Sequence, residues 1–346
     1  METRRVPLML VTHLVNIRYL TGFTGSAGIV LLGTRQGVLW VDPRYTLQAH
    51  EQAVGVEVIE EKKGILKGAA GWLRKNRVRE STFEASNLTY AQFEQLRQEA
   101  GHGLRLKPAA DLIEELRVVK DRAEIESMRR AGKVTAEVFA ETLPHVRPGV
   151  KEQDLAAEIE YLMRKKGAEG AAFETIVASG PRSAYPHARP SSKALQESEL
   201  VIFDLGAILG GYAADMTRTV FLGEPAHRVR DIFSAVREAQ AEAVRSVQES
   251  TPAGKIDSTA RRILARKGLA RFFTHSTGHG VGLEVHERPR IGKGETARLR
   301  SGSVVTVEPA VYLEGFGGIR IEDTVLVRPE GPEVLTPAPK ERWVIS

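Results

Sequence analysis

Residues 203–219 read FDLGAILGGYAADMTRT and carry two aspartates, Asp204 and Asp215, inside apolar segments that are typical of β-strands. A glycine-bearing turn joins the two segments, which predicts a hairpin. An isolated buried carboxylate is costly, because removing its charge from water costs more free energy than packing in a strand gives back. Either both aspartates reach solvent, or a positive charge lies between them. Since the facing ends of a hairpin can bring both acids to one point, we hypothesise that they bind a metal ion.

The composition is that of a globular protein with two domains. The chain has 346 residues, which exceeds a typical single domain of roughly 100–200 residues. Apolar residues make up 42% of the sequence, enough for a sizeable core. There is no cysteine, which excludes disulfides, thiolate metal sites and cysteine nucleophiles. The absence of cysteine also agrees with a reducing compartment, so we expect a cytoplasmic protein.

Neither nucleic acid nor a membrane is an expected partner. The formal net charge is +5, but the basic residues are interleaved with acidic ones and no basic run is flanked by aromatic residues. No stretch approaches the roughly 20 apolar residues that span a bilayer. The first apolar run stops at Thr12, so we expect a β-strand over residues 7–12 rather than a signal peptide.

Residues 1–115 are predicted to form an α/β domain, because strand-like and helix-like segments alternate. Strands are expected at 7–12, 28–33 and 37–42, helices at 45–54, 63–75 and 90–100, and a short strand between the last two helices. The boundary between the domains is expected between Pro108 and Val119.

Residues 120–346 are predicted to form an α+β domain whose helices cover one face of a sheet. Asp121 is a good N-cap for a helix that ends near residue 143, and Glu124 completes a capping-box pattern. Further helices are expected at 152–167, 225–249 and 257–268, and short strands near 173–178 and 200–205.

Further acids and histidines could join the two aspartates. His279 is flanked by glycines, which permit close approach of the backbone to a ligand. Glu308 and Glu322 lie in strand-like runs, where a lone carboxylate is again costly to bury. His286 follows His279 by seven residues, and His187 lies in the loop AYPHARP. Each residue alone has an ordinary alternative, because most acids are exposed and most histidines are structural or surface residues.

The combined donor set indicates a particular kind of metal site. Four carboxylates and one imidazole, without sulfur, suit Mn²⁺, Co²⁺, Fe²⁺ or Zn²⁺ with bridging carboxylates better than a structural zinc site. Four negative charges also balance two divalent cations. Two such ions about 3.5–4 Å apart activate a bridging water for hydrolysis.

The set resembles the Xaa-Pro peptidase family of prolidases and aminopeptidases P, which share the pita-bread fold with methionine aminopeptidases and creatinase. The matching contexts are FDLGA at Asp204, ADMTRT at Asp215, TGHGVGLEVHE at His279, VEPAVY at Glu308 and GIRIEDTVLV at Glu322. NIRYLTGFTGSAG and DPRYTLQA also resemble the family's N-terminal domain. The resemblance implies a creatinase/prolidase-like domain at 1–115 and a pita-bread catalytic domain at 120–346.

The resemblance also implies roles for individual residues. Asp215 and Glu322 would bridge two divalent metal ions, most often manganese. Asp204 would hold one ion, and His279 and Glu308 the other. Glu308 would also carry a proton to the proline nitrogen, while His187 and His286 would bind the scissile carbonyl or stabilise the tetrahedral intermediate. A homodimer is the expected assembly.

The preferred peptide length depends on Arg290, which follows His286 in HERPRI. By resemblance this arginine would bind the free proline carboxylate of an Xaa-Pro dipeptide, although a surface role is an ordinary alternative. We therefore expect a dipeptidase, with aminopeptidase P as the alternative. A methionine aminopeptidase, a creatinase-like hydrolase and a binding protein fit less well, because the chain has an N-terminal domain and all five ligand positions.

Two features differ from the family pattern. The helix that usually precedes the first strand is missing or much shortened, and PAVY replaces PGIY after Glu308.

Overall fold

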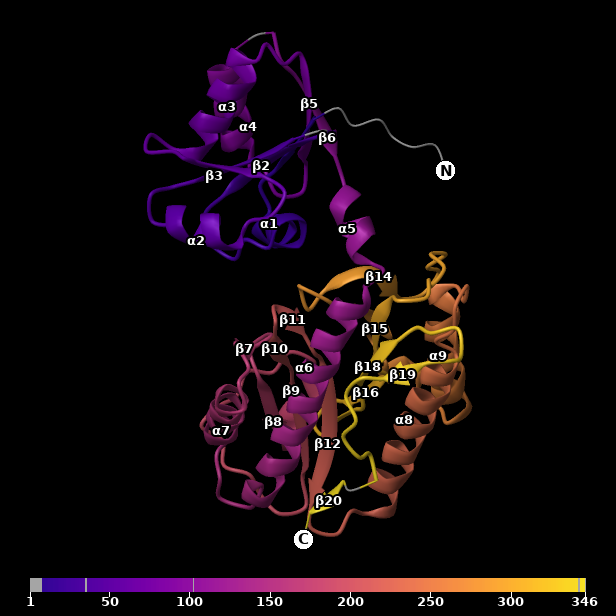
Figure 1. Cartoon of the computed structure of the whole chain (residues 1–346). Helices are drawn as coiled ribbons and strands as arrows, with labels where there is room; N and C mark the ends of the chain where they lie inside the picture. The colour runs from indigo at the N-terminus through magenta and orange to yellow at the C-terminus, as the bar shows by residue number, and fades with distance from the viewer. Residues whose placement is uncertain (1–7, 35, 102, 342, 346) are drawn as a thin grey trace. The chain divides into compact units, whose positions relative to one another are not determined.

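The computed structural model describes residues 8–34, 36–101, 103–341 and 343–345. The chain divides into two compact units, Met1–Arg117 and Val118–Ser346, and each is described by itself (Figure 1). The expected shortening of the first helix falls on residues 1–7, which lie outside the described residues.

The first unit is built on one six-stranded sheet with the order β4-β3-β2-β1-β5-β6. Apolar side chains alternate between its faces: Leu10, Leu31 and Trp40 pack with α3 and α4, while Val11, Val30 and Leu39 face the opposite core. The strands are β1 (Leu8–Val11), β2 (Ile29–Gly33), β3 (Gly37–Val41), β4 (Glu57–Glu60), β5 (Glu80–Glu84) and β6 (Arg105–Ala109). The helices are α1 (Leu14–Thr21), α2 (Thr46–Gln52), α3 (Ile65–Lys75), α4 (Tyr90–Ala100) and α5 (Leu112–Arg117).

Four elements of this unit were not expected from the sequence, and the first of them is β4, which pairs with β3. Helix α1 is short and has no side-chain cap at His13, so it lacks the usual start signal. Strand β6 contains Pro108, which a central strand would exclude, but β6 lies at the sheet edge and pairs only with β5 among the described strands. Helix α5 follows within the expected boundary region.

Four long helices organise the second unit. They are α6 (Arg122–Thr142), α7 (Glu152–Lys165), α8 (His227–Arg245) and α9 (Ala253–Arg266). The predicted capping box of α6 is confirmed, because the Asp121 side chain accepts hydrogen bonds from Ala123 N and Glu124 N while Glu124 accepts one from Asp121 N. Helix α9 starts four residues earlier than expected, directly after Pro252 at the N-cap, where the missing N–H of proline costs nothing.

The strands of the second unit form two main sheets. The first has the order β20-β12-β9-β8 and the second β14-β13-β15-β18-β19. Their bounds are β8 (Ile176–Ser179), β9 (Leu200–Leu205), β12 (Met216–Leu222) and β20 (Val344–Ile345), then β13 (Gly278–Gly280), β14 (Glu287–Ile291), β15 (Val304–Val307), β18 (Asp323–Leu326) and β19 (Glu333–Val334). Smaller sheets contain β7 (Gly170–Ala171), β10 (Ala207–Leu209) and β11 (Tyr212–Ala213), and β16 (Ala310–Leu313) with β17 (Gly317–Arg320).

The predicted hairpin is confirmed, since β9 and β12 are antiparallel neighbours. Its connection is more than a turn, because β10 and β11 form a small hairpin of their own around Gly210 and Gly211, both with positive φ.

The expectation that helices cover only one face is wrong. Odd-numbered residues of β9, such as Val201 and Phe203, pack against α6 and α7, whereas Leu200 and Ile202 join the core of α8 and α9. Figure 1 shows the two helix pairs on opposite sides of the strands. Asp204 follows Leu200 and Ile202 in the even-numbered set of β9, so its side chain faces the interior of the unit on the same side as theirs.

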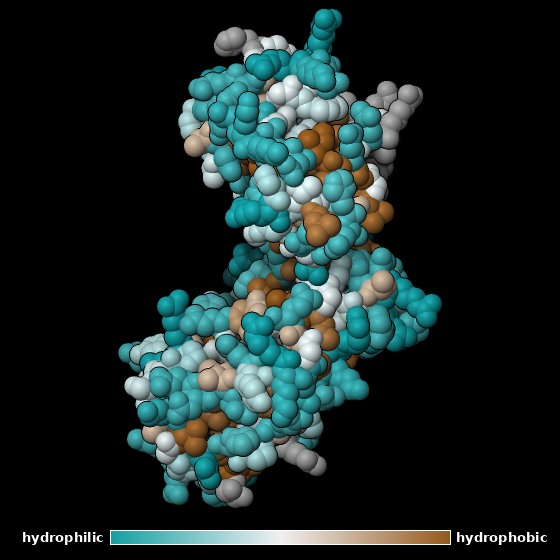
Figure 2. Space-filling model, turned by 60° about the vertical axis from the view of Figure 1, so that its left-hand side comes forward, coloured by the Kyte–Doolittle hydropathy of each residue, from teal (hydrophilic) through white to brown (hydrophobic). Residues whose placement is uncertain are grey.

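No helix in the described part of the chain has the length and apolarity needed to cross a membrane. On the face shown in Figure 2, hydrophilic residues predominate and apolar residues lie in separate patches.

Two helical glycines provide a test of the packing. A Cβ at Gly132 in α6 would lie 2.0 Å from the carbonyl oxygen of Leu335, whereas a Cβ at Gly71 in α3 would meet no atom within 4 Å. We expect Gly132→Ala to lower the free energy of unfolding by about 1–3 kcal/mol through overpacking. Gly71→Ala should raise it by roughly 0.5–1 kcal/mol, because alanine favours the helix. Calorimetric unfolding of both variants checks this, and a stabilising Gly132→Ala would contradict the packing of α6 on the C-terminal segment.

Candidate metal centre

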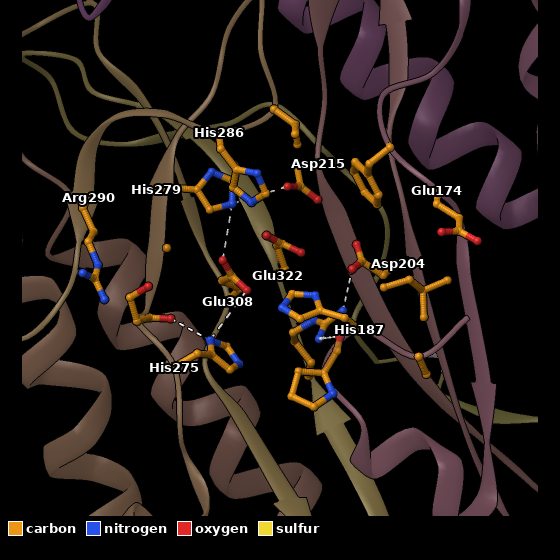
Figure 3. A pocket seen from close by; sticks show the side chains of 18 of the residues that line it. Glu174, His187, Asp204, Asp215, His275, His279, His286, Arg290, Glu308 and Glu322 are labelled. Carbon is orange, nitrogen blue, oxygen red and sulfur yellow. Dashed lines mark hydrogen bonds and ion pairs between the residues drawn. The ribbon is translucent and has the colours of Figure 1, made fainter. Parts of the chain in front are cut away.

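A cavity of about 730 Å³ lies in the second unit (Figure 3). It brings together every residue that the sequence proposed for the site, although these residues come from separate strands and loops. They are His187, Asp204, Asp215, His279, His286, Arg290, Glu308 and Glu322.

The hairpin of β9 and β12 presents its two aspartates on one face. Asp204 lies opposite Thr217 in the strand register, and Asp215 precedes Thr217 by two residues, so all three side chains point to the same side. Gly206 makes this approach possible, because a Cβ there would lie 1.9 Å from the carbonyl oxygen of Ala214. The next residues close the connection, with Ala214 N donating to Ala207 O at 3.0 Å.

The opposite wall of the cavity is joined to the hairpin by hydrogen bonds. Glu322 N donates to Thr217 O at 3.1 Å, and Thr217 Oγ1 donates to Glu322 Oε2 at 2.6 Å. Glu308 N donates to Thr277 O at 2.8 Å, which holds Glu308 beside the strand that carries His279. Backbone and side-chain bonds therefore set the positions of both glutamates.

Three of the five proposed ligands form a tight group. The ligand atoms of Asp215, His279 and Glu322 all lie within 4.8 Å of one another. His279 Nε2 is 3.6 Å from Asp215 Oδ2 and 3.5 Å from Glu308 Oε1, so Glu308 adjoins the group. Asp204 lines the same cavity but is held on its own side by Arg320, whose Nη2 is 2.5 Å from Asp204 Oδ2.

Burial makes this concentration of acids unfavourable without a cation. It raises the pKa of Glu308 to about 7 and raises that of Asp204. Burial, followed by the charges of neighbouring carboxylates, also raises the pKa of Asp215 and Glu322 well above their usual range. The four acids therefore repel one another as anions, and a bound cation would relieve that repulsion.

His279 has the tautomer of a metal ligand. Its Nδ1 lies 3.0 Å from the carbonyl oxygen of Gly280, which can only accept a hydrogen bond, so Nδ1 carries the proton. Burial lowers the pKa of His279 to about 4, which keeps the ring neutral. Its Nε2 lone pair therefore faces the oxygens of Asp215 and Glu308, an arrangement that a cation between them would stabilise.

A free carboxylate oxygen also fits a metal ion. Asp204 Oδ1 is buried and, within the described ranges, has no hydrogen-bond partner. Buried polar atoms are nearly always paired, so an unpaired anionic oxygen beside three other acids indicates a missing positive partner. The residues present thus fit divalent cations held by oxygen and imidazole donors.

The glycines around His279 also have a packing role that was not expected. A Cβ at Gly278 would lie 2.1 Å from Thr306 O, and a Cβ at Gly280 would lie 2.1 Å from Arg288 O. These glycines therefore permit the close packing of β13 between β15 and β14. Gly278 also lines the cavity, and the approach of a ligand to this backbone stays a prediction.

Three side chains near the acids were missed by the sequence reasoning: Arg320, Tyr312 and His275. Arg320 donates to Asp204, to Thr217 Oγ1 at 2.9 Å and to Tyr312 Oη at 2.8 Å. His275 lies 3.0 Å from Tyr312 Oη through Nε2 and 3.9 Å from Glu308 Oε2 through Nδ1. A signal for Arg320 was present, because an arginine two residues before Glu322 in an extended run shares its face.

The remaining predicted residues lie around the rim of the cavity. The ring of His286 is 4.3 Å from that of His279, centroid to centroid. His187 lies in the loop after the 3₁₀ helix Gly180–Ala184, and Arg290 lies on β14. Figure 3 shows Arg290 and Glu174 on opposite sides of the acids.

Comparison with known protein families identifies both parts of the chain. Residues 126–329 match the model of metallopeptidase family M24, and residues 1–119 match the creatinase/prolidase N-terminal domain. The chain belongs to metallopeptidase family M24. It is therefore a metallopeptidase, and the family implies a divalent metal at the acid cluster.

Relatives of this M24 protein match it over nearly their whole length. A Xaa-Pro dipeptidase of Pyrococcus horikoshii is 35% identical over 99% of this chain and 95% of its own. The structure of a Xaa-Pro dipeptidase from Bacillus anthracis has a TM-score of 0.95 at 36% identity, covering 98% of this chain and 95% of its own. That of an X-Pro aminopeptidase from Thermotoga maritima has a TM-score of 0.92 at 37% identity, covering 98% of each chain. These matches confirm the predicted fold class, an α/β N-terminal domain followed by a pita-bread domain.

Metal binding should be visible as thermal stabilisation. After removal of metal with a chelator, Mn²⁺ at about 100 times its dissociation constant should stabilise the protein by about 2.7 kcal/mol, which is roughly 5–10 °C in Tm. Glu322→Gln should abolish most of this shift, because it removes a central donor. Glu174→Gln is the matched control, since Glu174 lines the cavity but pairs with Arg189 outside the acid group. An unchanged shift in Glu322→Gln would contradict the assigned site.

Proposed function

We propose that this M24 enzyme is a dinuclear Xaa-Pro dipeptidase, which hydrolyses the bond between an N-terminal residue and proline. The observation that carries the proposal is the single cavity that joins the donor set of four carboxylates and one imidazole with Arg290. Relatives named Xaa-Pro dipeptidase, matched over almost the whole chain, support the Xaa-Pro bond as the target.

Two divalent cations would be held by the five donors. Asp215 and Glu322 would bridge them, Asp204 would bind one, and His279 and Glu308 would bind the other. When bound, such ions polarise a carbonyl and lower the pKa of water. The unpaired Asp204 Oδ1 and the free lone pair of His279 Nε2 support this distribution.

Glu308 and the rim histidines would act directly on the substrate. A Glu308 carboxylate oxygen would take the proton of the attacking water and deliver it to the proline nitrogen as the C–N bond breaks. His187 and His286 would donate hydrogen bonds to the carbonyl oxygen as it gains negative charge. Burial lowers the pKa of His286, so its ring acts as a neutral donor.

Arg290 supports the preference for dipeptides. A dipeptide presents a free proline carboxylate, and a guanidinium binds a carboxylate through two parallel hydrogen bonds. Aminopeptidase P activity on longer peptides is the alternative, and the likeness to the Thermotoga maritima aminopeptidase favours it. Manganese as the metal, a homodimeric assembly and a cytoplasmic location stay predictions. A creatinase-like or purely binding role is disfavoured, because the donor set is complete.

Peptide length is the first test of this function. Under the same Mn²⁺ conditions, Ala-Pro should be cleaved faster than Ala-Pro-Ala. Arg290→Ala should raise KM for Ala-Pro roughly 10- to 100-fold, which corresponds to the loss of a charge-assisted hydrogen bond, and should affect longer peptides much less. Arg288→Ala is the matched control, because Arg288 is an exposed arginine of the same strand and is not among the described residues that line the cavity. Faster cleavage of the tripeptide would show that the enzyme is an aminopeptidase P.

Metal content is the second test. Protein purified without chelator should contain about two equivalents of divalent metal per chain, as a bridged pair requires. Chelation should abolish cleavage of Ala-Pro, and Mn²⁺ should restore it better than Co²⁺, Zn²⁺ or Fe²⁺. Elemental analysis and activity of the reconstituted protein provide the measurement. A single equivalent at full activity would exclude the dinuclear site.

A further inference from the structure

Glu152 is a fully buried acid outside the metal centre. It is the first residue of α7, and its carboxylate accepts five hydrogen bonds from one loop. Oε1 accepts from the backbone N and from Oγ of Ser179, both at 2.8 Å. Oε2 accepts from Ser191 N at 3.0 Å, Ser191 Oγ at 2.6 Å and Arg182 Nε at 3.1 Å. These five hydrogen bonds from the loop and its flanks compensate the buried charge.

The donors to Glu152 lie at both ends of the loop that carries His187. Ser179 ends β8 and Ser191 follows Pro190, so one carboxylate joins the start and the end of the segment 179–191. Arg182 adds a link inside the loop, because its Nη2 donates to the carbonyl oxygen of Arg189 at 2.6 Å. The base of the loop is therefore closed by side chains and backbone groups that meet at Glu152.

The inner side of the same loop contacts the metal centre. Arg320, which holds Asp204, donates through Nη1 to the carbonyl oxygen of Pro186 at 3.1 Å. Ser183 Oγ accepts a hydrogen bond from Gly318 N at 2.8 Å. His187 directly follows Pro186 and lines the cavity. The loop is thus fixed at its base by Glu152 and at its inner side by β17.

All five groups around Glu152 donate hydrogen bonds, so only a side chain whose two terminal atoms both accept can satisfy them. The amide of glutamine would replace one oxygen with an NH₂ group, which would face donors instead of accepting from them. A Glu152→Gln side chain keeps the size of the original but places an NH₂ group against the backbone N–H of Ser179 or of Ser191, which loses its acceptor and loosens the loop. The chemistry of the contact, rather than its volume, therefore requires glutamate.

We propose that Glu152 is a positioning residue for His187. It closes the base of the loop 179–191 so that the imidazole is held at the cavity, in reach of the substrate carbonyl. This inference rests on the proposed function, in which His187 donates to that carbonyl.

A double-mutant cycle tests the coupling. Glu152→Gln should lower kcat/KM for Ala-Pro about 10- to 100-fold, because small displacements of a catalytic group have effects of that size. In a His187→Ala background the same change should lower kcat/KM less than about twofold, since the side chain through which it acts is absent. Metal content should stay at the wild-type value. Hydrogen–deuterium exchange of the peptide covering 180–190 should become faster in Glu152→Gln.

A matched control separates this role from general stability. Glu84, in the first unit, is also buried and accepts hydrogen bonds from Thr12 N, His13 N and Asn16 Nδ2. Glu84→Gln should lower the free energy of unfolding without changing exchange in the 180–190 peptide. If Glu152→Gln fails to fold, Ser191→Ala removes one donor to Glu152 and enters the same cycle.

The outcomes distinguish a failure of the inference about Glu152 from a failure of the proposed peptidase function. If His187→Ala lowers kcat/KM and the effect of Glu152→Gln or Ser191→Ala is fully additive to it, Glu152 does not act through His187 and the inference is overturned. If His187→Ala retains full activity on Ala-Pro, the role of His187 is wrong and the inference falls with it, while the peptidase activity itself stands. If no variant and no wild-type preparation cleaves Ala-Pro, the proposed function fails.

Discussion

The second unit depends on one electrostatic constraint, the convergence of four carboxylates in a mostly buried cavity. Their mutual repulsion is only partly offset by protein cations. Arg320 pairs with Asp204, and Arg218 lies behind the cluster, where it donates to Glu322 O at 2.5 Å and to Asp323 Oδ1 at 2.8 Å. The contact with Arg320 leaves Asp204 Oδ1 without a hydrogen-bond partner among the described residues, and the contact of Arg218 with Glu322 involves only the backbone of Glu322. Arg320 and Thr217 occupy only one oxygen each of Asp204 and Glu322, so negative charge remains in the cavity that divalent cations would neutralise.

The donor set is complete only when two parts of the unit meet. The hairpin of β9 and β12 supplies Asp204 and Asp215, whereas His279, Glu308 and Glu322 come from the region of β13 to β18. Thr217 joins the parts through its bonds with Glu322, and Thr324 Oγ1 adds a bond to Asp215 O at 2.8 Å. The cavity therefore exists only when the whole unit is packed. The helix cores and the candidate metal centre depend on the same packing.

Local patterns made much of the fold and site predictable, and the failures share a cause. The N-cap at Asp121, the strand alternation and the acids in apolar runs are all read within a few residues. Helix α1 has no capping side chain, and Pro108 is acceptable in β6 only because that strand lies at an edge. The packing of Gly278 and Gly280 against the carbonyl groups of Thr306 and Arg288 could not be predicted from their places beside His279. Each of these depends on a partner distant in sequence.

The sequence by itself identified the five proposed donors of oxygen and nitrogen, in contexts that also indicate the two-domain architecture. Side-chain alternation and the cost of burying acids are local properties, so they can be read along the chain. Tertiary structure alone decided which Asp204 oxygen has no hydrogen-bond partner in the described ranges and which tautomer His279 has. It also decided that Arg320, Tyr312 and His275 lie beside the acids. It also decided that Glu152 closes the loop of His187. These are contacts between distant segments, and their geometry exists only after the chain has packed.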